Sequence, residues 1–227
     1  DVYKRQTIGT GTLVMVPMVE WVIDNQGWRD AYRLLAIMTA VLLTVAAIGA
    51  HRPPTSAASP VPIREAIRGR VDFWILYVSS ILISITLFTP FVFLADYIDT
   101  VGGTGSAAVL LGLIGMSSIA GRLGFGAVAA RIGITGLYQL SFLVLSLSVL
   151  LWIVADTSYS LLILFAVVLG VAYGGFIALS PAVVAVRFGV VGMGGVLGAL
   201  STAAGVGGLV GPPTIGAIID ASGHTAA

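Results

Sequence analysis

The sequence predicts an all-α, polytopic membrane protein, and three observations carry this prediction. Of the 227 residues, 58% are apolar and only 9% are charged, whereas soluble domains carry about 25% charged residues. The apolar residues form runs of roughly 20, the length that one helix needs to cross a bilayer. Short polar segments separate these runs, as expected when each spanning helix must satisfy its own backbone. A formal net charge of +1 and the absence of cysteine give no sign of a nucleic-acid partner, a disulfide framework or a thiolate zinc site.

Seven runs are expected to span the membrane. They cover residues 7–23, 31–50, 72–95, 106–129, 136–155, 160–182 and 190–216. The six residues before them, DVYKRQ, match one reading frame of a transposon-end sequencing adaptor. We therefore expect residues 1–6 to be an adaptor-derived scar outside the fold; the alternative is a genuine short cytoplasmic loop.

The connection at residues 51–71 has the composition of a linker, because four prolines stiffen it and Ser and Ala surround them. It divides residues 7–50 from residues 72–227. Its second half, IREAIRGRVDFW, has apolar and basic residues at helical spacing and is expected to lie at the membrane surface. The connections after the second, fourth and sixth runs carry Arg52, Arg64, Arg68, Arg70, Arg131 and Arg187. Those after the third, fifth and seventh carry Asp96, Asp99, Asp156 and Asp220 and no Lys or Arg, and the first, at residues 24–33, carries charges of both signs. This alternation predicts that loop 51–71 is cytoplasmic.

Small residues are expected to mediate helix packing, because lipid tails compete equally for apolar side chains and close backbone approach gains contact. The last run is the densest in glycine. From it we predict packing positions at Gly194, Gly198, Gly205 and Gly208. Similar close faces are expected at residues 121, 124 and 126 and at residues 170, 174 and 175.

The order of these features resembles the major facilitator superfamily. The segments that carry the resemblance are GTGTLVMVP, GWRDAYRLL, the basic linker, GRLGFGAVAARIG, GVAYGGFIALSPAVVAVRFG and GPPTIGAIIDASG. The sequence is most similar to monocarboxylate-transporter-like and oxalate/formate-antiporter-like members. The resemblance implies a partial twelve-helix fold: residues 7–50 would be the last two helices of the N-terminal six-helix bundle, and residues 72–227 helices 7 to 11. Helices 1 to 4 and 12 would be missing, so such a fragment is not expected to transport by itself.

Arg122 is the residue whose presence most needs an explanation. It lies about 6 Å to the cytoplasmic side of the centre of the run 106–129. A charge at such depth costs at least about 2.5–3.5 kcal/mol on insertion scales, so a functional role is the default hypothesis. The guanidinium fork matches a carboxylate. The resemblance implies the same role, because the helix 8 arginine of monocarboxylate transporters, implicated in substrate binding, falls on Arg122.

A second role for Arg122 stays open. Many superfamily members carry Gly-Arg here as the start of a cytoplasmic gating motif, whose other positions would be Gly121, Gly126, Arg131 and Gly133. The sequence has Ala130 where that motif usually has Asp. It also has Ser118 where monocarboxylate transporters place an acid one helical turn before the arginine, so a coupling proton would need another group.

Two further residues complete the predicted binding set. Ser118 faces the same side of its helix as Arg122, and Tyr173 could donate a hydrogen bond to a substrate oxygen. No cation occurs between residues 189 and 219, although oxalate-antiporter-like members have a helix 11 lysine. A monocarboxylate is therefore favoured over a dicarboxylate, with a coupling proton or a counter-transported anion as the possible driving partner.

Enzymatic and cofactor-binding motifs are not supported. GFGAVA fits a loose dinucleotide pattern but lies within an apolar run and follows no strand. Asp220 and His224 are two isolated ligand types, so no metal is expected. The sequence thus predicts a secondary transporter for a small organic anion in a bacterial inner membrane, without catalytic residues or cofactor. The alternatives are an efflux transporter of amphipathic compounds, or a non-transporting truncated protein, sensor or scaffold.

Overall fold

The structure is a computed structural model that describes residues 15, 18, 19, 21–49, 67, 69–100, 105–155, 158–189 and 193–221. The predictions for residues 1–6, for most of the first span at 7–23, for most of the linker at 51–71 and for His224 fall outside these residues. Within the described ranges, six helices are long and apolar enough to cross a membrane, and no strand occurs. The predicted all-α class is confirmed.

The six helices follow the second to seventh predicted spans. They are α2 (Trp28–Gly49), α4 (Val71–Thr100), α5 (Ala107–Ile132), α6 (Ile134–Ala155), α7 (Tyr159–Phe188) and α8 (Met193–Ala221). Most of them run past the predicted ends. Asp96, Asp99, Arg131, Arg187 and Asp220, which we expected in connections, lie instead in helical turns. The physical reason is length, because a helix such as α4 extends beyond the roughly 30 Å hydrocarbon core and its charged turns reach the polar region.

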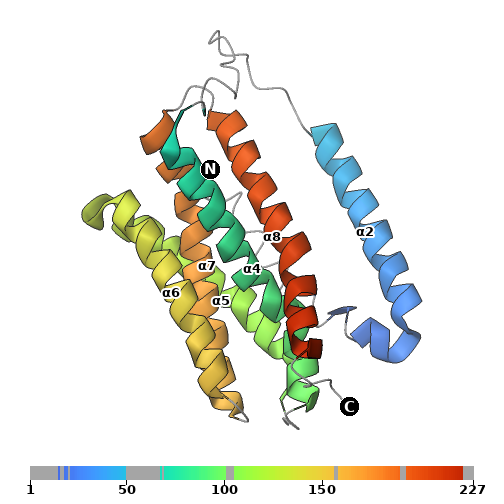
Figure 1. The fold of residues 1–227 in the computed structure, drawn as a ribbon. Helices are drawn as coiled ribbons and strands as arrows, with labels where there is room; N and C mark the ends of the chain where they lie inside the picture. The colour runs from blue at the N-terminus through green and yellow to red at the C-terminus, as the bar shows by residue number, and fades with distance from the viewer. Residues whose placement is uncertain are drawn as a thin grey trace.

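Two pairs of parallel helices form the centre of the molecule, and α6 runs antiparallel along α7 (Figure 1). The first pair is α5 with α7, and the second is α4 with α8. Glycines bring both pairs together: a Cβ at Gly170 would collide with Ser117 and with the Ile114 carbonyl, and one at Gly207 would come within 2.6 Å of the Ser84 Cβ. Buried apolar side chains such as Leu110, Phe165 and Leu169 fill the core beside the α5–α7 pair.

The glycines of α8 do not all pack in the way that we expected. Among the four predicted positions, only Gly208 has a neighbour, since a Cβ there would lie 3.1 Å from the Phe88 ring. A Cβ at Gly194, Gly198 or Gly205 would meet nothing within 4 Å among the described residues, so their packing role stays a prediction. The close approach to α4 is made at Gly207 and Gly211, on another side of the same helix.

α2 stands to one side of the other five helices (Figure 1). Ala31 is its one buried residue in the described range, and large apolar side chains such as Ile37, Leu42 and Val45 are exposed. An apolar surface of this extent is unfavourable in water and fits contact with lipid or with further apolar helices.

The charged residues separate to the two ends of the bundle. Arg70 precedes α4, Arg131 lies in the last turn of α5 and Arg187 in the last turn of α7. Because neighbouring helices in the chain alternate in direction, these three arginines share one end, at the top of Figure 1, which we call the basic end. Asp99 and Asp220 lie at the opposite end.

Candidate functional site

Arg122 lies inside the helix bundle and near the middle of α5. Its side chain is 6% exposed, and it is the one charged residue that is buried in the described part of the chain. The midpoint of α5 falls between residues 119 and 120, so Arg122 lies about 4 Å from it toward the basic end. The structure thus places the guanidinium where the cost of burying a charge is high.

The contact between α5 and α7 fixes the depth of Arg122. A Cβ at Gly174 would collide with the carbonyl oxygen of Ser118 and would lie 3.0 Å from the backbone nitrogen of Arg122. A Cβ at Gly121 would collide in turn with the carbonyl of Val171. The two backbones therefore touch in the helical turn that leads to Arg122, which only glycine permits.

Tyr173, predicted to donate a hydrogen bond to a substrate oxygen, lies within electrostatic reach of Arg122. It precedes Gly174 in α7, it is half-buried against the core, and the charge of Arg122 acts electrostatically on its hydroxyl. The pair offers a cation and a hydroxyl donor from two different helices. A carboxylate oxygen can accept hydrogen bonds from both kinds of group.

Ser118 is buried at the α5–α7 contact, and its hydroxyl donates to the Gly115 carbonyl at 2.7 Å. Its neighbour Ser117 donates to the Leu113 carbonyl at 2.7 Å. Both hydroxyls satisfy carbonyls of their own helix, the usual arrangement for serine in an apolar helix. Ser118 therefore lies at the helix contact, and its predicted contact with substrate stays a prediction.

The predicted gating residues are spread from the middle of α5 to its end. Gly121 is buried against α7, a Cβ added at Gly126 would meet nothing within 4 Å among the described residues, and Arg131 is exposed. Gly133 ends the helix at a φ of 99°, and its N–H donates to the Ala129 carbonyl at 3.1 Å. A positive φ at a helix end favours glycine. The local structure thus explains why glycine occurs at two of the four positions, Gly121 and Gly133.

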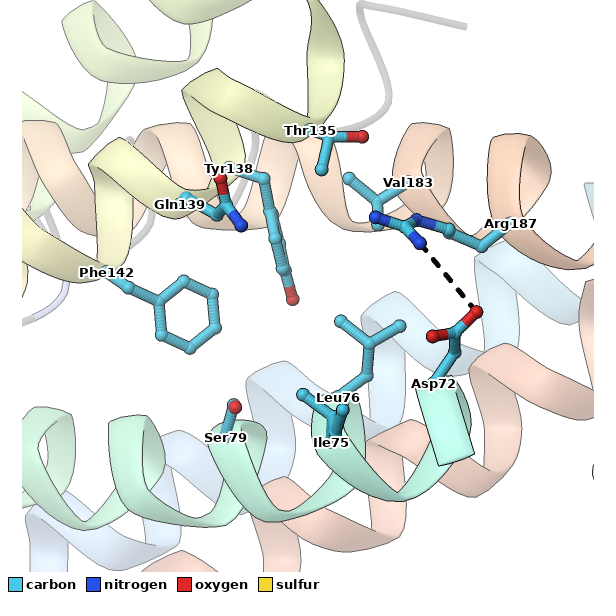
Figure 2. Close-up of a pocket in the computed structure, with 10 residues that line it drawn as sticks. All are labelled: Asp72, Ile75, Leu76, Ser79, Thr135, Tyr138, Gln139, Phe142, Val183 and Arg187. Carbon is cyan, nitrogen blue, oxygen red and sulfur yellow. Dashed lines mark ion pairs between the residues drawn. The ribbon is translucent and has the colours of Figure 1, made fainter. Parts of the chain in front are cut away.

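A separate pocket of about 440 Å³ opens at the basic end, between the starts of α4 and α6 and the end of α7 (Figure 2). Its lining residues are Asp72, Ile75, Leu76, Ser79, Thr135, Tyr138, Gln139, Phe142, Val183 and Arg187. Arg122, Ser118 and Tyr173 are not among them. The sequence did not predict this pocket, because its residues come from three runs whose neighbours were unknown.

Two contacts between helices were also missed. The Tyr138 ring of α6 stacks on Phe176 of α7 with ring centroids 5.6 Å apart, and its hydroxyl faces the pocket. The hydroxyls of Tyr77 and Thr202 lie 3.1 Å apart and join α4 to α8. In the sequence, only the presence of hydroxyl side chains within apolar runs could have marked these residues as candidates for contacts between helices.

The described ranges contain no group of three or more His, Asp or Glu side chains that could hold a metal ion. The candidate residues of the site are instead one cation, Arg122, and two hydroxyls, those of Ser118 and Tyr173. Such a set can bind an anion through charge and hydrogen bonds.

One family profile and several curated proteins are similar to the chain. The sequence profile of the Major Facilitator Superfamily matches residues 7–212. "MFS transporter asaE" of Aspergillus flavus is 30% identical over 96% of this chain and 51% of its own length. "Monocarboxylate transporter 13" of Rattus norvegicus is 29% identical over 96% and 52%, and "Aspyridones efflux protein apdF" of Emericella nidulans is 25% identical over 94% and 44%. The chain spans about half the length of the curated relatives it matches.

Proposed function

The chain belongs to the Major Facilitator Superfamily, and from this premise we propose that it forms part of a secondary transporter, not an enzyme, that moves a small organic anion by alternating access. A monocarboxylate is the proposed substrate class. Relatives named as monocarboxylate transporters support this choice, and so does the single buried cation in the described chain. Two bundles that rock around a midplane site would carry the anion across the membrane.

The single observation that carries the proposal is the position of Arg122, buried near the centre of α5. An anion in this low-dielectric region interacts with a cation roughly four times more strongly than in bulk water. Arginine adds two parallel hydrogen bonds to one carboxylate. One buried cation matches one carboxylate, which favours a monocarboxylate over a dicarboxylate.

The proposed location is the cell membrane, with the basic end toward the cytoplasm. Arg70, Arg131 and Arg187 gather at that end, and cytoplasmic connections carry the excess of Lys and Arg. The relatives compared are fungal and mammalian, so the bacterial membrane expected from the sequence stays a prediction. The proposed driving partner is a counter-transported anion, or a proton carried by a group other than Ser118.

The test is uptake of labelled lactate, pyruvate and formate by cells that express the full reading frame containing this chain. We compare the unmodified protein with Arg122→Gln and Arg122→Lys at matched surface expression. Arg33→Gln is the control, because it removes an exposed cation whose ion pair with Asp30, at 2.7 Å, lies at the surface. Saturable uptake that is lost in Arg122→Gln and kept in Arg33→Gln supports the proposal. Uptake that persists in Arg122→Gln contradicts it.

A second candidate is efflux of amphipathic compounds, and the similarity to a protein named for aspyridone efflux favours it. Efflux predicts that cells loaded with a fluorescent amphipathic dye lose it faster when the protein is present, while carboxylate uptake stays at background. If the cells show no carboxylate uptake and no dye efflux, the result would indicate a non-transporting sensor or scaffold.

A further inference from the structure

A hydrogen bond, a cation–π contact and an ion pair at the basic end connect the start of α4 with the end of α7. Arg70 donates from Nη2 to the carbonyl oxygen of Arg187 at 2.6 Å, and its guanidinium lies over the Phe188 ring at 4.5 Å. In the opposite direction, Arg187 Nη1 lies 3.7 Å from Asp72 Oδ2, across the pocket mouth (Figure 2). We call Arg70, Asp72, Arg187 and Phe188 the clamp.

The electrostatics of both helix ends favour the clamp. Arg70 places a positive charge at the C-terminus of α7, where the helix dipole is negative, and Asp72 places a negative charge in the first turn of α4. The two contacts differ in strength. The Asp72 and Arg187 side chains are 48% and 44% exposed, and such ion pairs contribute little. The short charge-assisted hydrogen bond and the ring contact of Arg70 therefore hold the clamp together.

Pro181 divides α7 between the clamp and the Arg122 region. It lies inside the helix, where it removes the hydrogen bond to the carbonyl of Ile177 and permits a bend. Tyr173 and Gly174 lie on one side of Pro181, and Arg187 and Phe188 on the other. The segment beyond the proline keeps its direction through the clamp and through packing of Val184 near Phe73.

We infer that the clamp is a conformational device that holds the segment of α7 beyond Pro181 against the start of α4. Arg70 immediately precedes α4, so its contact joins the start of that helix to the end of α7. Release of the clamp lets the end of α7 swing away from α4. The consequence for transport rests on the proposed function, but the clamp itself is tested without any substrate.

The experiment measures the distance between α4 and α7 with two spin labels. The chain contains no cysteine, so Val78→Cys and Val186→Cys, at positions 52% and 61% exposed, introduce its only label sites. Cysteines elsewhere in the full-length protein are replaced first. Distance distributions are recorded in lipid nanodiscs for the unmodified clamp, Arg70→Gln and Arg187→Gln. Arg131→Gln is the matched control, because it removes an exposed arginine at the same end.

We expect Arg70→Gln to shift the distribution to longer distances and to broaden it. Arg187→Gln should shift it less, because the backbone carbonyl that accepts from Arg70 remains. Arg131→Gln should leave it unchanged, and Pro181→Ala, which restores the helix hydrogen bond, should suppress the shift caused by Arg70→Gln.

An unchanged distribution in Arg70→Gln, or an equal shift in Arg131→Gln, overturns the inference. If Arg70→Gln does not fold, Arg70→Lys keeps the charge without the planar fork and should give a smaller shift. Loss of anion uptake in Arg122→Gln is independent of these distances, so the failure of one proposal is distinguishable from the failure of the other.

Discussion

Gly174 of α7 lies directly against the carbonyl oxygen of Ser118 in α5, on the face of α5 that carries Arg122. The contact is between backbones, so the depth of Arg122 is set by how closely two helices approach. Side chains at the contact, such as Ser117 and Ser118, satisfy carbonyls of their own helix. A change in the approach of α7 therefore moves the buried cation even when Arg122 itself is intact.

We predict that Gly121→Ala destabilises the protein by roughly 1–3 kcal/mol, because its Cβ would collide with the carbonyl of Val171 and force the helices apart. Gly124→Ala, three residues along the same helix, meets no atom within 4 Å among the described residues. It should be neutral or stabilise by up to about 1 kcal/mol through helix propensity. Thermal unfolding in detergent compares the two.

An equal effect of the two alanines would mean that Gly121 is not held against α7. Uptake provides a second comparison at a temperature where both variants are folded. If Gly121 acts only in packing, the loss of uptake in Gly121→Ala should follow its loss of stability; a larger loss of uptake would point to gating.

Arg122→Met should abolish anion uptake without lowering the melting temperature. Methionine has a similar length and removes a charge that costs about 2.5–3.5 kcal/mol near the centre of a spanning helix. Uptake assays and melting curves on the same membranes check both halves of the prediction. A melting temperature well below that of the unmodified protein would show that Arg122 supports the fold, which would favour helix anchoring over substrate contact.

Hydropathy predicts the spans well because the membrane imposes one length on every helix. α2 and α4 to α8 follow six of the seven predicted runs, but the ends differ where charged residues follow the apolar stretch. Asp96 and Asp99 interrupt the hydropathy signal without interrupting the helix, since α4 continues to Thr100. Helix ends depend on the surrounding polar region, which composition does not specify.

The burial of Arg122 could be predicted from the sequence because one charge within an apolar run is unusual. Which residues face it could not be derived, since this depends on α7 packing beside α5. The glycines at 170, 174 and 175 marked the contact correctly, but nothing in their spacing named α5 as the partner. Likewise, the contact between Arg70 and Arg187 could not be derived, because it joins residues that are 117 positions apart in the chain.

Tyr173→Phe tests whether the hydroxyl beside Arg122 contacts the anion. The substitution keeps the ring against the core and removes one donor, worth about 0.5–1.5 kcal/mol net. We expect KM for the carboxylate to rise roughly two- to tenfold, with little change in the maximal rate. Concentration-dependent uptake separates the two parameters. An unchanged KM would mean that the hydroxyl serves the neighbouring protein groups instead.

The orientation of the bundle can be tested by cysteine labelling, because the chain has no cysteine of its own. Thr100→Cys lies at the end opposite the basic end, and Ala130→Cys lies near Arg131; both positions are exposed. If the basic end is cytoplasmic, a membrane-impermeant maleimide should label Thr100→Cys in intact cells and Ala130→Cys only after permeabilisation. The reverse pattern would place the arginines outside. The clamp would then act on the external side of the site, because Arg70 and Arg187 share that end with Arg131.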